Sequence, residues 1–162
     1  MTYAHLEDLA SEMNGPRPST RVFLSDLSSL QTDTKIRFLG CVTKYTVATG
    51  RLILEHNYPR SKTTPSSVSV DITGILEDVT AEALRIGTWL NVLGYIREIE
   101  PIQPTSSFSS NSGDANQTST VPPRPVYVEA IMVFAAGAIA IGDYELILRN
   151  SQDVERMMNF KD

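Results

Sequence analysis

Cationic and aromatic side chains follow one another between residues 44 and 60 in a pattern that suits a nucleic-acid strand. Unpaired bases stack on aromatic rings, at about 1–3 kcal/mol per base, while cations pair with the phosphates. The alternative interpretation is that the tyrosines are ordinary half-buried residues of a strand pair. The predicted nucleic-acid-binding residues are Lys44, Tyr45, Arg51, His56, Tyr58 and Arg60.

Charge is unevenly distributed around this segment. The chain of 162 residues has a net charge of −5. Residues 35–62 contain six Lys or Arg and one acid, Glu55, which gives +5 and leaves −10 for the rest. A local positive segment favours phosphate contacts, although solvated cations on two strands would give the same pattern. Because the rest of the chain is acidic, we expect the isolated chain to bind single strands weakly and to lose binding steeply with salt.

The residue types that perform catalysis or hold metals are sparse. The chain has two histidines, His5 and His56, and neither lies at the spacing of a metal or nucleophile site. Its one cysteine, Cys41, excludes an internal disulfide and a zinc site built on several thiolates. Cys41 follows Gly40 inside an apolar run, which predicts a small buried residue. We therefore predict no enzymatic activity, no metal and no cofactor.

Composition is that of a soluble globular protein, with 41% hydrophobic and 20% charged residues. No stretch approaches the roughly 18 apolar residues of a membrane span. The first residues, MTYAHLEDLASEMNG, are acidic and lack the apolar core of a signal peptide. We interpret the chain as an intracellular, single-domain protein without a membrane association.

Five segments have the alternating apolar pattern of strands. Two of them contain a glycine among apolar residues, Gly40 in RFLGCVTKY and Gly94 in VLGYIREI. Long strands of a small closed barrel must bend sharply, and a glycine relieves the crowding at the bend. The predicted strands are Lys35–Tyr45, Arg51–His56, Val68–Thr73, Trp89–Ile99 and Val126–Ala136.

Three segments have helical spacing, namely residues 2–13, Glu77–Ile86 and 143–160, the last with Asp143 as a candidate N-cap. Residues 1–20 are predicted to form an N-terminal helix and connector, and residues 21–160 a single domain. Within that domain, the Ser- and Pro-rich residues 101–125 are predicted to be a flexible loop. The order of elements predicts a mainly β, five-stranded OB-fold barrel, with the Glu77–Ile86 helix closing one end.

Several spaced blocks of sequence resemble the fungal form of the Ten subunit of the telomere-capping CST complex. The similarity covers about Arg21 to Arg149 and omits the Ser-rich loop. Its most specific parts are FLGCV-x-x-Y, LEHNYP, W-x-NV-x-GY and the AxG…YE stretch before the last helix. The 101–125 insert and the N-terminal helix have no counterpart that we can align.

The resemblance implies a non-enzymatic OB-fold subunit that forms a heterodimer with the Stn subunit through its barrel and C-terminal helix. The pair would act within a trimeric CST complex in the nucleus, at the telomeric region of the chromosome. It would protect single-stranded telomeric DNA, bind it weakly, and assist fill-in synthesis.

The last predicted helix has an apolar stripe broader than one small barrel needs to cover it. Leu146 and Phe160 widen the stripe further. The alternative is that the helix packs only on its own barrel. A second apolar patch, of Trp89, Leu93 and Tyr95, would suit either a partner or the N-terminal helix. The predicted partner-binding residues are Tyr144, Ile147, Leu148, Val154, Met157 and Met158.

Two other functions fit the same sequence. One is the small OB-fold subunit of a replication-protein-A-like complex. The other is an OB-fold module that binds a protein or an oligosaccharide and has no role on DNA. Salt distinguishes the second from a DNA-linked module, because affinity for a single strand falls as salt rises.

Overall fold

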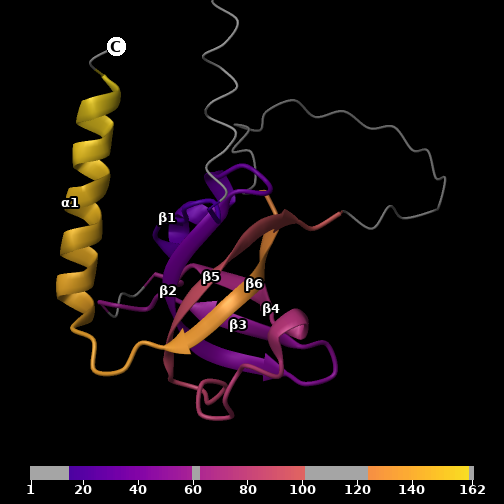
Figure 1. Ribbon diagram of the computed structural model, residues 1–162. Helices are drawn as coiled ribbons and strands as arrows, with labels where there is room; N and C mark the ends of the chain where they lie inside the picture. The colour runs from indigo at the N-terminus through magenta and orange to yellow at the C-terminus, as the bar shows by residue number, and fades with distance from the viewer. Residues whose placement is uncertain (1–14, 60–62, 101–123, 161–162) are drawn as a thin grey trace, which may run out of the picture.

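The structure, a computed structural model, describes residues 15–59, 63–100 and 124–160 (Figure 1). The predicted N-terminal helix and most of the predicted 101–125 loop lie outside these ranges. The strands are β1 (Thr20–Arg21), β2 (Lys35–Thr46), β3 (Arg51–Glu55), β4 (Ser67–Asp71), β5 (Trp89–Glu98) and β6 (Val126–Ala135). The helices are the 3-10 helices η2 (Leu24–Ser29) and η3 (Thr73–Ile75) and the α-helix α1 (Ile141–Asn159).

The strands form a closed barrel because β2 pairs with two neighbours along its length. Residues 35–41 of β2 pair with β5, and residues 41–46 pair with β3. The remaining order is β3-β4-β6-β5, with β4 and β6 parallel and the short β1 added in parallel to β2. A closed five-stranded barrel of this order is the predicted OB-fold.

The two strand glycines lie at irregular points of the barrel wall. Gly40 lies next to Cys41, where β2 changes partner, and an added Cβ would lie 3.0 Å from Cβ of Leu54. Gly94 lies at the register shift between β5 and β6, where a Cβ would overlap the carbonyl oxygen of Glu129. Gly94 therefore excludes a side chain, and at Gly40 the Leu54 side chain would have to shift, which supports the predicted reason for the glycines.

The barrel interior contains the inward-facing residues of every long strand. Leu90, Val92 and Ile96 of β5 are fully buried, as their alternation predicts. At one end of the barrel, Leu24 and Leu27 of η2 join the same core. The end of the barrel is thus closed by a segment for which the sequence analysis predicted no helix.

The prediction of a helix at Glu77–Ile86 is wrong. After η3, this segment consists of turns, although Ala83 is still 3% exposed and packs on the core. Threonine side chains bond to the backbone here: Oγ1 of Thr80 accepts from the Ala83 N–H, and Oγ1 of Thr88 donates to the Glu82 carbonyl. The Thr80 bond is that of a helix N-cap, but the residues after it form only i→i+3 backbone bonds, and the left-handed Gly87 ends the segment. A segment this short gains little helical stability of its own.

The C-terminal helix begins at Ile141, slightly earlier than predicted. Its N-cap is Ala140, which makes no side-chain cap, and Asp143 lies in the first turn instead of capping the helix. An acid in the first turn still complements the helix dipole. Figure 1 shows α1 standing along one side of the barrel, beside β1 and β2.

Candidate partner and nucleic-acid surfaces

One face of α1 packs on its own barrel through four side chains. The ring of Tyr144 lies 5.8 Å from the Arg21 guanidinium, and Gln152 donates to the Asp26 carboxylate at 3.0 Å. Leu148 is 2% exposed and Glu145 contacts the barrel at His56. Because these residues lie one, four and eight positions after Tyr144, they share one side of the helix.

The rest of α1 presents apolar side chains to solvent, a surface that we call the free face of α1. Ile147 and Val154 border a shallow depression with Asn150, Ser151 and Glu155. Contiguous exposed apolar side chains on a small protein mark an interaction surface. The free face consists of Leu146 (56% exposed), Ile147 (58%), Val154 (55%), Met157 (72%), Met158 (69%) and Phe160 (89%).

The structure divides the predicted partner-binding residues between the two faces. Ile147, Val154, Met157 and Met158 lie on the free face. The structure corrects the prediction that Leu148 binds the partner. Its side chain is 2% exposed, packs on its own barrel and has no surface left for a partner.

Tyr144 is half-buried on the barrel side. Burial raises the pKa of its phenol above the ordinary value, against the opposing effect of Arg21 and Arg37. The spacing of Tyr144, Leu148 and Gln152, four residues apart, is the signal that could have identified this second face.

His56 is enclosed between the barrel and α1, which corrects its predicted role as a nucleic-acid contact. Its Nε2 lies 2.6 Å from Oε1 of Glu145, and its Nδ1 lies 3.4 Å from the Leu39 carbonyl oxygen. The edge of its ring meets Trp89 at a centroid distance of 5.4 Å. With its side chain 11% exposed, His56 offers no face on which a base could stack.

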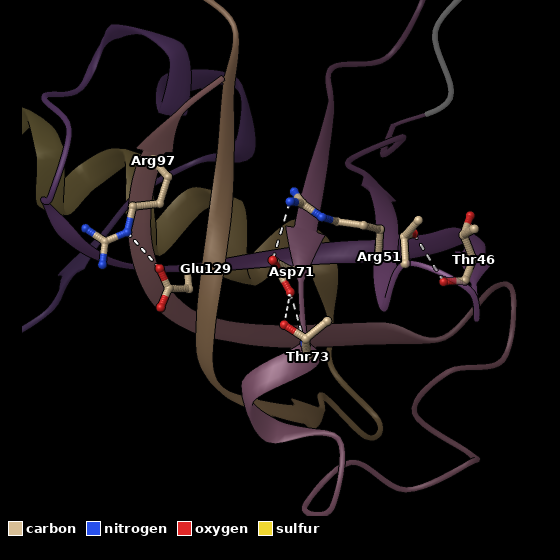
Figure 2. Close-up of polar contacts among 7 residues, drawn as sticks. Thr46, Arg51, Asp71, Thr73, Arg97 and Glu129 are labelled. Carbon is tan, nitrogen blue, oxygen red and sulfur yellow. Dashed lines mark hydrogen bonds and ion pairs between the residues drawn. The ribbon is translucent and has the colours of Figure 1, made fainter. Parts of the chain in front are cut away.

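Two arginines on the outer wall of the barrel, Arg51 and Arg97, are already paired with carboxylates. Arg51 forms an ion pair with Asp71 at 3.4 Å, and its guanidinium lies 4.4 Å from the ring centroid of Tyr127. Figure 2 shows Asp71 between Arg51 and Thr73, with the Arg97–Glu129 pair on the neighbouring strands. A phosphate that approaches Arg51 would therefore compete with a carboxylate.

The remaining predicted nucleic-acid residues occupy different places. Lys44 is exposed and shares the outer side of the β2–β3 pair with Arg51. Tyr45 packs against the core, as the alternative interpretation stated. Tyr58 is 45% exposed and lines a depression in the loop after β3, and Arg60 lies outside the described residues. The set therefore does not converge on one groove.

The part of the chain that the structure describes gives no support for a metal site, a membrane-spanning helix or a reactive cysteine. That part contains no group of three or more side chains placed to hold a metal ion. None of its helices combines the length and apolar character needed to cross a bilayer. Burial raises the pKa of the Cys41 thiol, helped by the charge of Glu55, so this cysteine is a buried apolar residue as predicted.

Two solved structures have a similar fold. A chain of the S. pombe Stn1–Ten1 complex is 22% identical, with a TM-score of 0.57, and the match covers 86% of this chain and 96% of that one. The S. pombe telomere capping protein Ten1 is 22% identical, with a TM-score of 0.56, covering 84% and 99%. No individual curated protein was found to match. At this identity the likeness establishes the OB-fold alone.

The sequence itself carries the stronger relationship. The family described as Ten1, telomere capping, CST complex subunit, matches residues 10–149. This range includes the whole described barrel and the first part of α1, with Tyr144, Glu145 and Leu148 of the four residues that pack on the barrel. The chain therefore belongs to the Ten1 family of telomere-capping subunits of the CST complex.

Proposed function

We propose that this subunit forms a heterodimer with an Stn-type OB-fold protein, mainly through the free face of α1. The observation that carries this proposal is the set of six apolar side chains on that face, each more than half exposed. A fold relative from S. pombe exists in a complex with Stn1, which supports a partner of this type. The dimer would act within a trimeric CST complex at nuclear telomeres.

The free face suits a partner helix or an apolar groove. Fully burying one aliphatic or methionine side chain stabilises a complex by about 1.5–3 kcal/mol. Methionine is flexible and polarizable, so Met157 and Met158 can adapt to the shape of a partner. An amphipathic helix that is anchored on one side and apolar on the other is a recurrent recognition element.

Co-expression with an Stn-type protein, followed by size exclusion with mass analysis, tests the interface. Val154→Asp with Met158→Asp should separate the pair, because both carboxylates would be buried against an apolar partner. The matched control is Val47→Asp with Ile86→Asp, since these residues are also exposed but lie on barrel turns away from α1. Co-migration of the α1 variant at one-to-one stoichiometry would contradict the proposed interface.

We also propose a weak contribution to single-stranded DNA binding, telomere end protection and fill-in synthesis. Lys44 and Tyr58 are the predicted residues that remain accessible, and Arg51 contributes only in competition with Asp71. The salt dependence of strand binding by the assembled complex tests this contribution.

The CST assignment is favoured over a replication-protein-A-like subunit by the family match. No observation favours an oligosaccharide ligand.

A further inference from the structure

A pocket of about 370 Å³ lies between η2 and the starts of β4 and β6, and its lining is partly apolar and partly polar. Ser25 and Ser28 of η2 line one side, and Ser66 and Ser67, at the start of β4, line another. Arg124 completes the lining just before β6. We call this site the serine pocket. Its volume falls in the range of small-ligand sites, about 300–1,000 Å³.

The serine pocket is positively charged. Arg124 is the one charged residue that lines it, and none of its lining residues is acidic. Nη2 of Arg124 donates to the Leu30 carbonyl oxygen at 2.5 Å, while its buried Nε has no partner. Within the described ranges, Arg124 makes no ion pair. A guanidinium held partly out of water without a counterion favours binding of an anion.

The serines supply free hydrogen-bond donors around this charge. None of the four hydroxyls makes a hydrogen bond to another of the described residues. The neighbouring Ser29, which does not line the pocket, differs because its hydroxyl donates to the Asp26 carbonyl at 2.7 Å. Four hydroxyls and a guanidinium offer more donors than the two oxygens of a carboxylate can use, but they suit the oxygens of a phosphate.

We propose that the serine pocket binds a phosphate group. Two sources have this chemistry, the free phosphate ion and the backbone of a DNA strand. Ser66 also lines the depression beside Tyr58, so the two hollows adjoin at this residue. A strand held at Tyr58 would therefore have a backbone phosphate within reach of the serine pocket; this second source rests on the proposed DNA role.

The test is a titration of the full isotope-labelled chain with inorganic phosphate, followed through the backbone amide shifts of the pocket residues. Sodium chloride at matched ionic strength is the ionic control. We expect saturable shifts at Ser25, Ser67 and Arg124.

Arg124→Gln should weaken binding at least about tenfold, because it removes a charge-assisted contact. Ser29→Ala should leave the titration unchanged. Shifts that do not saturate, or that Arg124→Gln does not alter, would overturn the proposal.

A second variant separates loss of the site from loss of folding. Ser28→Asp keeps Arg124 and its bond to Leu30 but places a carboxylate in the pocket, so it should also abolish the phosphate response. Far-ultraviolet circular dichroism verifies that each variant is folded. An intact phosphate response in folded Ser28→Asp would contradict the site.

The source is identified with a single-stranded oligonucleotide. If the backbone supplies the phosphate, Arg124→Gln lowers strand affinity of the assembled complex, and inorganic phosphate competes at constant ionic strength. If strand affinity is unchanged while phosphate still binds, the pocket is a site for the free ion. The phosphate titration uses the isolated chain and does not involve the free face of α1, so its failure is distinct from failure of the partner proposal and of the DNA proposal.

Discussion

Nε2 of His56 and Oε1 of Glu145 lie 2.6 Å apart, and this contact joins the barrel to α1 across 89 positions of sequence. Both side chains are largely enclosed, at 11% and 15% exposure. The other ring nitrogen of His56 faces the Leu39 carbonyl oxygen, so both its neighbours are acceptors. These two contacts fix the orientation of the ring between the barrel and α1.

We predict that this pair positions α1 for its partner. His56→Ala and Glu145→Ala should each weaken the heterodimer several-fold, with the barrel still folded. In a double-mutant cycle the pair should show a coupling free energy of about 0.5–3 kcal/mol, measured by urea unfolding. Glu77→Ala, at an exposed position in the turns after η3, is the control. Strictly additive effects of His56→Ala and Glu145→Ala would show that the contact contributes nothing.

Gly94→Ala should destabilise the barrel by at least about 1–3 kcal/mol, because the added methyl overlaps backbone and forces the β5–β6 bulge to move. Gly40→Ala should destabilise the barrel less, because the added methyl group contacts the Leu54 side chain and not the backbone. Gly74→Ala is the matched control, because no atom lies within 4 Å of the added Cβ, and its change should stay within about 0.5 kcal/mol. Chemical denaturation measures all three. Equal effects at Gly94 and Gly74 would contradict the proposed crowding.

Asp71 should make stability depend on pH in the acid range. Burial raises the pKa of its carboxyl, but bonds from the Thr73 hydroxyl and N–H and the charge of Arg51 outweigh that effect and lower the pKa below its usual value. A lowered folded-state pKa gives stability that is complete above the unfolded-state pKa, about 3.9, and is lost as pH falls through the folded-state pKa.

At pH 7, Asp71→Asn should therefore reduce the free energy of unfolding by about 1 kcal/mol. The difference from the wild type should shrink as the pH falls below about 4. Urea unfolding across this range measures it, with the exposed Asp153→Asn as control. A difference that stays constant down to pH 2 would contradict the lowered pKa.

DNA binding by the assembled complex should respond to charge on the outer wall of the barrel. Lys44→Glu should weaken binding to a single strand several-fold and reduce the steepness of its salt dependence. Asp71→Asn should strengthen binding, because it frees Arg51 from its carboxylate. Fluorescence anisotropy over a salt series measures both. Arg85→Glu, in the turns before β5, carries the same charge change as Lys44→Glu, and an equal loss there would indicate net charge alone.

The barrel could be predicted from the sequence because its signals are local. These signals are the alternation of apolar residues in the strands and the two glycines, Gly40 and Gly94, inside them. Membership in the Ten1 family confirms the predicted CST identity and the absence of enzymatic activity. The segment from Glu77 to Ile86 was predicted incorrectly because its apolar residues and a capping threonine fit a helix, while the structure forms only turns with i→i+3 backbone bonds there.

The candidate site was less predictable, because it depends on contacts between distant residues. The apolar stripe of α1 was recognised, but the four-residue spacing of Tyr144, Leu148 and Gln152, which places Leu148 against the barrel, was not separated from it. The enclosure of His56 needs Glu145, and the neutralisation of Arg51 needs Asp71. The serine pocket joins residues 25–28, 66–67 and 124, which only folding brings together.

Among the described residues, the last hydrogen bond from α1 to the body of the protein is that of Gln152 to Asp26, and the helix continues to Asn159. At 1.5 Å per residue, about 10 Å of helix extends past that attachment. Displacement at the end of a rigid helix grows with distance from its attachment, so a small change in the angle of α1 would move Met157–Phe160 further than it moves Tyr144. The orientation of the proposed partner would therefore depend on the contacts that hold the first half of α1 to the barrel.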